Sequence, residues 1–337
     1  MKLNKKITLI IITYNRSYYI ERLLKYYSLK NFDQNIIVAD ASDNDSVKNN
    51  KIIYKSLESN LSLTVKYLPG YSIVDCVDSV LDGVTTPYVV FHPDDDFFIP
   101  SALIKMTNFL DKNPDYSGVN GKAIVQEERE LSNGQRSVHN TTGYSMRELI
   151  GSDSIDRVEN LLGNYFGVLF SVFRKDALKK AYYKIPGNGI IAFELIPACR
   201  AASIGNIGHL DMLFLVRSVH RNRVYIPGFY DGILEPDWSD NIKVFKDDFN
   251  RITNLNQKNV ENKFIFEKII KKYYARDNSK VKFQGNIFLR KAKNFFYVLF
   301  NLTEIYILKG IKNPFYLGSN ELKLVLDVVE EKKENFK

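Results

Sequence analysis

The chain has 337 residues, of which 45% are hydrophobic and 26% charged, which is typical of a globular protein with one large domain and an appendage, or with two domains. Its two cysteines, Cys76 and Cys199, have neither metal-ligand nor redox spacing, so nothing indicates an oxidising compartment. No stretch has the roughly 18 uninterrupted apolar residues that a membrane-spanning helix requires. We therefore expect a cytoplasmic protein.

The net charge of +8 is concentrated in the last part of the chain. Residues 1–240 carry 27 Lys and Arg against 28 Asp and Glu, whereas residues 241–337 carry 20 against 11. Phe, Tyr, Leu and Ile are interleaved with these basic residues, which favours an anionic membrane surface over nucleic acid as a partner. Phe295–Leu308 is either a core helix of a small helical domain or a helix that docks on the inner face of the membrane.

The first 111 residues alternate between strand and helix patterns. Strands are predicted at 7–13, 36–39, 63–68 and 88–93, and helices at about 17–27, from 45 or 46, at 72–81 and at 100–111. The charged start leads into the first strand rather than a leader peptide, because no small-residue cleavage site follows it. Such alternation on short connections predicts a parallel sheet whose ligands bind at the carboxyl ends of the strands.

The pattern changes after Tyr116. We expect strands at 119–125, 165–174 and 206–219, and helices at 152–162 and from about 175 to 183. Residues 127–144 are polar and indicate a loop or a mobile hairpin. Residues 191–203 are apolar, and Pro197 must start or kink any helix there.

Polar clusters follow three of the predicted strands, at residues 13–16, 40–43 and 94–96. The last cluster is three consecutive carboxylates, Asp94, Asp95 and Asp96, which repel one another. In an enclosed site a cation must neutralise them, and oxygen ligands suit Mg²⁺ or Mn²⁺; the alternative is a solvated acidic turn. Glycine-rich dinucleotide loops and P-loops are absent from the sequence, which argues against those enzyme classes.

Three segments, Thr8–Arg16, Ile36–Ser42 and Val89–Phe97, closely resemble in order and spacing the nucleotide-sugar domain of family 2-like, GT-A fold glycosyltransferases that build surface polysaccharides. The resemblance is strong over residues 5–125 and looser through 165–174 and 193–220.

This resemblance implies an α/β fold of the GT-A type, which is Rossmann-like, with a mostly parallel sheet flanked by helices. Residues 1–240 would form the GT-A domain, with a nucleotide-sugar-binding half at 1–125 and an acceptor half at 126–240. Residues 241–337 would form a basic, aromatic-rich helical C-terminal region.

The resemblance also implies a nucleotide-binding role for the first two strand ends. At the end of the first strand, after Thr13, Tyr14 would lie against the nucleobase, where a ring can stack without exact orientation. Asn15 and Arg16 would supply donors near the base or the phosphates. Asp40 resembles the acid that accepts a hydrogen bond from the base edge, although it could instead be a helix cap or turn residue.

The acidic triplet would form the metal corner of such a site. By resemblance, Asp94 touches the ribose, and Asp95 and Asp96 belong to the metal-binding part, with the inner-sphere ligand left open between them. His220 is placed like the histidine that completes the metal site in some relatives; a surface histidine is the alternative. Mn²⁺ or Mg²⁺ would bridge the diphosphate and stabilise the charge on the leaving nucleoside diphosphate.

Glu194 is the candidate general base, because inverting transfer needs a carboxylate that takes the proton of the acceptor hydroxyl. Its apolar surroundings in the sequence would raise its pKa toward useful basicity. A buried acid that pairs with Arg200 or caps a helix is the structural alternative, and Asp211 is the weaker candidate base. The Glu-Asp pair usual in the family is missing, because Leu195 follows Glu194.

We therefore expect a metal-dependent, inverting glycosyltransferase that moves a sugar from a nucleoside diphosphate sugar to a hydroxyl of a surface glycan or lipid-linked acceptor. One alternative is a sugar nucleotidyltransferase, although such enzymes carry a glycine-rich loop and this chain has no glycine before Gly70. The other is a non-catalytic glycan-binding or membrane-binding protein of the same fold.

Overall fold

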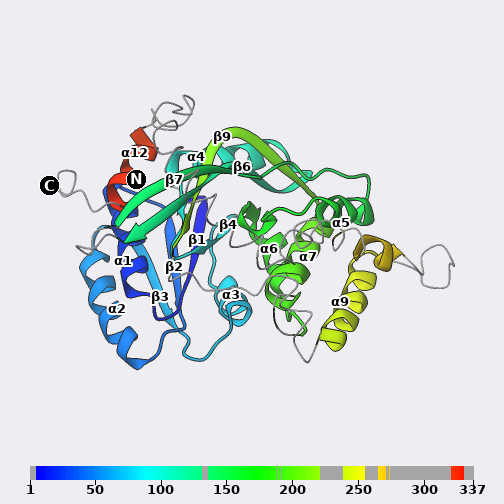
Figure 1. The fold of residues 1–337 in the computed structure, drawn as a ribbon, viewed down its shortest axis with the longest axis horizontal. Coiled ribbons are helices and arrows are strands. Elements are labelled where there is room, and N and C mark those ends of the chain that lie inside the picture. The colour runs from blue at the N-terminus through cyan, green and yellow to red at the C-terminus, as the bar shows by residue number, and fades with distance from the viewer. Residues whose placement is uncertain are drawn as a thin grey trace, which may run out of the picture.

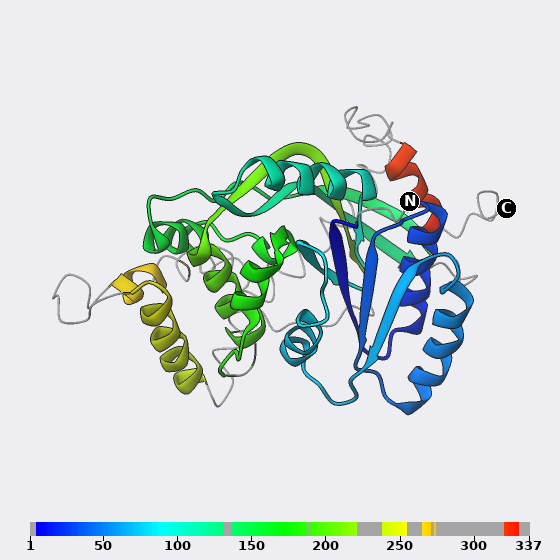
Figure 2. The same ribbon diagram turned by 180° about the vertical axis from the view of Figure 1, so that it is seen from behind.

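The computed structural model describes residues 5–130, 136–187, 189, 191–220, 238–254, 265–270, 273 and 320–329. Its main body is one mixed sheet with the strand order β3-β2-β1-β4-β8-β6-β9-β5, and β7 pairs with β6. Helices α1 and α2 cover one face of the first three strands, and α3 covers the other (Figures 1 and 2).

The first half of the sheet is parallel, as the alternating pattern predicts. Its strands are β1 (Ile7–Thr13), β2 (Asn35–Asp40), β3 (Ser62–Tyr67) and β4 (Tyr88–Pro93), and its helices are α1 (Ser17–Leu29), α2 (Asn44–Leu57) and α3 (Ile73–Leu81). In the register Thr13 lies opposite Asp40, and Ile12 lies opposite Pro93. The polar clusters that follow β1, β2 and β4 therefore meet at one edge of the sheet, as expected.

The helices of this half begin where the sequence supplies caps. The side chain of Asp43 accepts a hydrogen bond from Ser46 N at the start of α2. At the start of α3, Ser72 and Asp75 exchange hydrogen bonds as a capping box. These caps satisfy backbone N–H groups that lack partners within the helix, so they fix where each helix leaves the ligand edge.

The second half of the sheet is mostly antiparallel. It consists of β5 (Phe97–Phe98), β6 (Tyr116–Glu130), β7 (Arg136–Tyr144), β8 (Val172–Arg174) and β9 (Asn206–Val219), with α4 (Pro100–Lys112) after β5. β9 runs parallel to β6 and pairs at its end with β5, so that Phe97 lies opposite Val216. This pairing brings the end of β9 beside the acidic triplet, which immediately precedes β5.

Of the two alternatives for residues 127–144, the structure shows the hairpin, because Glu127–Glu130 extend β6 and Arg136–Tyr144 form β7 in an antiparallel pair. One face of such a hairpin tolerates polar residues, so polarity alone is a poor sign of a loop. One prediction for this half is wrong: residues 165–174 are not a single strand, since Val168–Phe170 form a 3₁₀ turn and only Val172–Arg174 pair in the sheet.

Helices complete the part of the molecule that follows β7 in the sequence. They are α5 (Ser154–Gly163), α6 (Lys175–Tyr182), a π-helical turn (Ile191–Leu195), α7 (Ile196–Ile204) and α9 (Trp238–Ile252). Pro197 lies in the first turn of α7, where its missing N–H costs nothing. The ion pair between Arg200 and Asp248 joins α7 to α9.

Helices α9 and α12 (Asn320–Val329) pack at different places. α9 packs against α7, whereas α12 packs against α1 and β7, at the other end of the molecule (Figure 1). Leu322, Val325 and Val329 of α12 are buried. Phe295–Leu308 lies outside the described residues. No helix within the described ranges is long and apolar enough to cross a bilayer.

The close contact between β6 and β9 predicts a specific stability effect at Gly121. An added Cβ there would lie 2.8 Å from the carbonyl oxygen of Met212 and 2.9 Å from Cβ of Phe214. Because backbone atoms cannot easily give way, Gly121→Ala should lower the free energy of unfolding by about 1–3 kcal/mol. Denaturant unfolding measures this.

Gly143 in β7 is the matched control, because a Cβ there meets nothing within 4 Å. Gly143→Ala should change stability by less than about 0.5 kcal/mol. Equal stabilities for the two variants would contradict this account of the sheet.

Candidate active site

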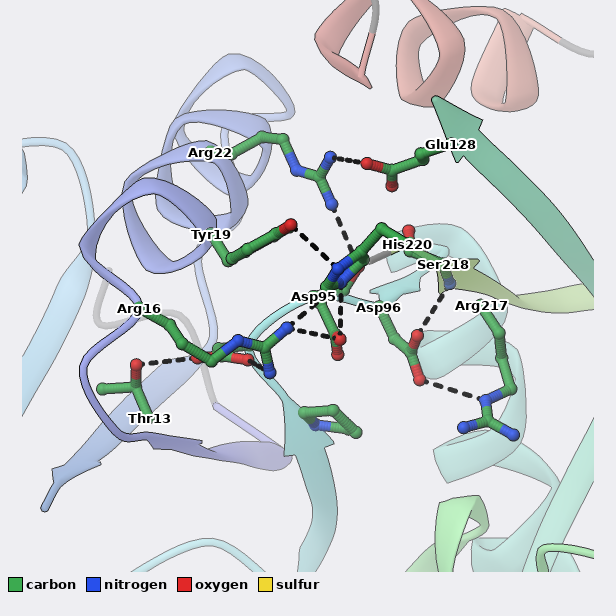
Figure 3. Close-up of polar contacts among 12 residues, drawn as sticks. Thr13, Arg16, Tyr19, Arg22, Asp95, Asp96, Glu128, Arg217, Ser218 and His220 are labelled. Atoms are coloured by element: carbon green, nitrogen blue, oxygen red, sulfur yellow. Dashed lines mark hydrogen bonds and ion pairs between the residues drawn. The ribbon is translucent and has the colours of Figure 1, made fainter. Parts of the chain in front are cut away.

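The acidic triplet lies where β1, β4, α1 and the end of β9 meet (Figure 3). Asp94, Asp95 and Asp96 are 2%, 7% and 1% exposed, so the triplet is not a solvated turn. Three buried carboxylates need donors or cations around them. The surrounding elements supply a different partner to each.

Arg16 connects the first two aspartates. It lies in the short loop between β1 and α1, and its Nη1 donates to Asp94 Oδ1 at 2.6 Å while its Nη2 donates to Asp95 Oδ2 at 2.6 Å. Thr13 Oγ1 adds a hydrogen bond of 2.7 Å to Asp94 Oδ2. The end of β1 thus carries the positive charge and the hydroxyl that hold Asp94 in place.

His220 contacts the second aspartate from the end of β9. Its Nε2 lies 3.0 Å from Asp95 Oδ2 and 3.2 Å from Arg16 Nη2. The residue is 9% exposed, so the structure does not support a solvent-exposed surface histidine. Arg16 and His220 therefore both contact the Asp95 carboxylate, although they lie 204 positions apart in the chain.

Asp96 turns to a separate set of partners. Its Oδ1 accepts from the backbone N–H of Ser218 at 2.9 Å, and its Oδ2 accepts from Arg217 Nε at 3.2 Å. Figure 3 shows its carboxylate directed toward these β9 residues, whereas the carboxylate of Asp95 meets His220 and Arg16. The sequence did not single out Arg217, which lies three residues before His220.

The three carboxyl groups have different electrostatic environments. Burial raises the pKa of Asp94, although the charge of Arg16 opposes this, and burial likewise raises the pKa of Asp96 against the charge of Arg217. Burial would also raise the pKa of Asp95, but the hydrogen bond from His220 and the charge of Arg16 hold it below its ordinary value. Asp95 is therefore the member of the triplet that is most firmly ionised.

A divalent ion fits beside Asp95 and His220 by the chemistry of its donors. Among the residues that the structure describes, no three Asp, Glu, His or Cys side chains are grouped around one point. Asp95 Oδ2 and His220 Nε2 are 3.0 Å apart, however, which is about the separation of neighbouring ligands in an octahedral shell with bonds of about 2.1 Å. Mg²⁺-type sites commonly use one or two protein ligands and take the others from substrate phosphates and water.

The predicted nucleotide-binding residues have distinct surroundings. Tyr14 is 57% exposed at the end of β1, so its ring is free to contact a ligand. Asn15 has a positive φ of 53°, and its amide exchanges hydrogen bonds with the side chain and the N–H of Asp43. Its amide group therefore ties the ends of β1 and β2 together.

Asp40 is fully buried at the end of β2. Its Oδ2 accepts from Asn50 at 2.9 Å and from Tyr54 at 2.8 Å, and its Oδ1 accepts from Ser42 N at 3.0 Å. These three donors hold the Asp40 carboxylate in place, and its part in base recognition stays a prediction. Tyr67, at the end of neighbouring β3, is 39% exposed and was not singled out in the sequence.

Glu194 lies in the π-helical turn before α7, a rare conformation that often occurs at functional sites. Burial, and then the charge of Glu194, raises the pKa of Tyr165, to which Glu194 is also hydrogen-bonded. Burial raises the pKa of Tyr144, Arg217 opposes this, and Glu194 and Asp96 both add to the rise. Tyr144 thus lies within electrostatic reach of both Glu194 and the acidic triplet.

The alternatives for the base look different in the structure. Arg200 forms a bidentate pair with Asp248, at 2.9 and 2.7 Å, and its remaining donors bind backbone carbonyls, so pairing of Glu194 with Arg200 is not found. Asp211 is exposed and forms an ion pair with Lys122. It lies nine residues before His220 in β9, or about 30 Å along an extended strand.

Comparison with known proteins assigns the family. The sequence matches Glycosyl transferase family 2 over residues 8–181, just over half of the chain. The chain belongs to glycosyl transferase family 2. The matched residues include the three segments on which the resemblance rested, and the match confirms that resemblance. The protein is a glycosyltransferase rather than a nucleotidyltransferase or a non-catalytic binding protein. No curated relative matches the sequence.

The likeness to one solved structure, with a TM-score of 0.50, supports the GT-A fold of this family 2 chain, and two further structures are similar at lower scores. S. aureus TarS is 14% identical with a TM-score of 0.50, and the alignment covers 80% of this chain but 43% of that one. TarS 1–349 with UDP-GlcNAc is 16% identical (TM-score 0.46, 80% of each chain). The mannosyltransferase PcManGT from Pyrobaculum calidifontis, with GDP-Man and Mn²⁺, is 12% identical (TM-score 0.46, 99% and 88%).

The histidine that precedes the triplet predicts how stability responds to acid. His92 Nδ1 lies 2.6 Å from Pro93 O, a carbonyl that can only accept, so Nε2 accepts from Tyr27 OH at 2.7 Å. Burial lowers the pKa of His92 to about 3, from an ordinary value of 6.5. Between these values only the unfolded chain binds this proton, so stability falls as pH drops.

The expected loss from His92 is about 1.4 kcal/mol for each pH unit below about 6.5. His92→Asn keeps a donor for Pro93 O but cannot titrate, so its free energy of unfolding should fall less steeply between pH 7 and pH 5. Chemical denaturation of both proteins measures the slopes. Parallel slopes would show that His92 is not held neutral in the folded protein.

Proposed function

We propose that this glycosyltransferase uses a nucleoside diphosphate sugar and a divalent cation, Mn²⁺ or Mg²⁺, and inverts the anomeric centre of the transferred sugar. The observation that carries the proposal is the convergence of Arg16, Asp95 and His220 at the ligand edge of the sheet. Asp95 and His220 are two candidate ligands for the cation, and Arg16 supplies a guanidinium. This set suits a diphosphate, which brings its own oxygen ligands for the cation and negative charge for the guanidinium.

Each part of the donor has a candidate partner at this edge. The exposed ring of Tyr14 offers a surface on which the nucleobase can stack. Asp94, held by Thr13 and Arg16, accepts a hydrogen bond from a ribose hydroxyl. Asp40 accepts a hydrogen bond from the edge of the base. Asp95 and His220 hold the cation beside the diphosphate, and Asp96 holds Arg217 and the end of β9 in position.

The chemistry then needs a base on the opposite side of the sugar. Glu194 takes the proton of the acceptor hydroxyl, whose oxygen forms the new bond to the anomeric carbon. The bond from that carbon to the diphosphate oxygen breaks, and the electron pair leaves with the nucleoside diphosphate. A bound cation stabilises the negative charge of this leaving group, and Arg16 adds a second positive charge near it.

The acceptor side is inferred from the sequence. We infer a hydroxyl of a surface glycan or of a lipid-linked glycan as acceptor, bound by residues 126–240. The basic, aromatic-rich segment 241–337 supports contact with an anionic membrane surface, where a lipid-linked acceptor would lie. Nucleic acid is not part of this proposal.

The cation and donor part is tested by binding. A thermal-shift panel of nucleoside diphosphates and nucleotide sugars, with and without Mn²⁺, should find a ligand whose stabilisation depends on the ion, because a ligand that binds only the folded state raises its melting temperature. Asp95→Asn should weaken Mn²⁺-dependent binding of that ligand at least about tenfold in calorimetry, because it removes a charged ligand.

Asp96→Asn is the matched comparison, since it makes the same change one residue away. It should lower the melting temperature by loosening Arg217 and the end of β9 while retaining more of the Mn²⁺-dependent affinity than Asp95→Asn. Equal ion-dependent binding in wild type and Asp95→Asn would refute the assignment of Asp95.

The base assignment is tested by kinetics with the donor that the panel identifies. Glu194→Gln keeps the size of the side chain but cannot accept the proton, so kcat should fall about 10²- to 10⁴-fold with little change in the KM for the donor. Asp211→Asn is the control and should keep the wild-type rate. A rate loss in Asp211→Asn with normal turnover in Glu194→Gln would exchange the two roles.

A further inference from the structure

We propose that Tyr19 is a positioning residue for His220, and that Arg136 of the β6–β7 hairpin holds Tyr19 in that role. The proposal rests on the cation site proposed above, to which it adds a supporting layer. Neither Tyr19 nor Arg136 contacts the cation; both act by fixing which ring nitrogen of His220 faces Asp95.

Tyr19 fixes the imidazole in two ways. Its hydroxyl lies 2.8 Å from His220 Nδ1, and its ring stacks on the imidazole with centroids 4.3 Å apart and planes inclined by 19°. Stacking sets the plane of the imidazole, and the hydrogen bond sets its rotation within that plane. With Nδ1 held, Nε2 faces Asp95 at 3.0 Å.

Arg136 fixes the tyrosine hydroxyl from the other side. Its Nη1 donates to Tyr19 Oη at 2.8 Å, and its guanidinium lies 5.0 Å from the centroid of the Tyr19 ring. A guanidinium only donates, so the phenol oxygen accepts from Arg136. Its second lone pair would accept from Nδ1–H of His220 when Nε2 binds a cation, because Nε2 can be a ligand only if the ring hydrogen is on Nδ1. Tyr19 is 3% exposed, so solvent offers this hydroxyl little competing contact.

The contacts form a closed circuit that returns to Asp95. Arg136 lies 3.5 Å from Glu128 Oε2. The same Glu128 oxygen accepts from Arg22 Nη1 at 2.8 Å, and Arg22 Nη2 donates to the carbonyl oxygen of Asp95 at 3.1 Å (Figure 3). The side chain of Asp95 is thus held through His220 and Tyr19, and its backbone through Arg22 and Glu128.

This circuit gives its buried charges a function. Arg22 and Glu128 are each 5% exposed, and burying an ion pair so deeply brings little net stability. Such a pair is better explained by the geometry that it enforces. In metal sites, loss of the partner that orients a ligating histidine typically weakens metal binding about 10- to 100-fold.

The test measures Mn²⁺ affinity without turnover. Binding of Mn²⁺ alone to the full chain is followed by the loss of the free-ion signal in electron paramagnetic resonance. Tyr19→Phe keeps the ring and removes only the hydroxyl, and its dissociation constant should rise about 10- to 100-fold over wild type. Tyr26→Phe, on the same helix but with its hydroxyl 3.4 Å from Phe98 O, should bind like wild type.

A double-mutant cycle shows whether Tyr19 acts through His220. In a His220→Ala background, Tyr19→Phe should have no further effect on the Mn²⁺ dissociation constant. Wild-type affinity in Tyr19→Phe, or an equal added loss in the His220→Ala background, would overturn the proposal.

A metal-free spectrum separates this proposal from the cation site itself. The chain has four histidines, so ¹⁵N spectra of the imidazole rings can be assigned. The Nδ1 resonance of His220 should shift in Tyr19→Phe, because this nitrogen loses its hydrogen-bond partner. An unchanged His220 spectrum in Tyr19→Phe would overturn the positioning role of Tyr19. Unaltered Mn²⁺ binding in the single variant His220→Ala would instead refute the cation site proposed above.

Discussion

Neutralising three consecutive buried carboxylates is the constraint on which the rest of this site depends. Arg16 lies 2.6 Å from both Asp94 and Asp95, and Arg217 and the N–H of Ser218 hold Asp96. Uncompensated, such charges would cost far more than the few kcal/mol by which domains are stable. The partners come from the loop after β1 and from the end of β9, so the fold must bring these two segments to the same strand end.

The sheet topology meets this requirement. β1 and β4 are parallel neighbours, which places Arg16 beside the triplet, and the pairing of β5 with β9 places Arg217 and His220 on its other side. The same arrangement separates the roles of the carboxylates: Asp95 faces a histidine and a guanidinium, whereas Asp96 anchors a strand. Adjacent residues in the sequence thus gain different chemistry from different neighbours.

The parallel half could be predicted from the sequence because its signals are local. Buried apolar runs, capping residues and strand-end polar clusters are recognised within about ten residues, and the strands and helices between Ile7 and Lys112 follow them closely, apart from the two-residue strand β5. The resemblance to family 2 glycosyltransferases rested on these segments, and the family match confirms it.

The second half of the sheet and the contacts around the acidic triplet depend on pairing between distant segments, which local sequence patterns do not reveal. The polar stretch 127–144 belongs to the antiparallel pair of β6 and β7, and its charged residues Glu128 and Arg136 contact α1. Arg22 and Tyr19 lie three residues apart on the inner face of α1, a weak sign of a buried polar role. The different contacts of Asp95 and Asp96 could likewise not be predicted without knowing where β9 lies.

The most direct test of the cation site is a crystal structure with a nucleoside diphosphate and Mn²⁺, in which anomalous scattering locates the ion. The account predicts a peak bonded to both Asp95 Oδ2 and His220 Nε2 and to phosphate oxygens, with Arg16 turned from Asp95 toward the diphosphate. An ion bound elsewhere in the site, or a diphosphate bound with the Arg16–Asp95 pair intact and no ion between Asp95 and His220, would contradict it.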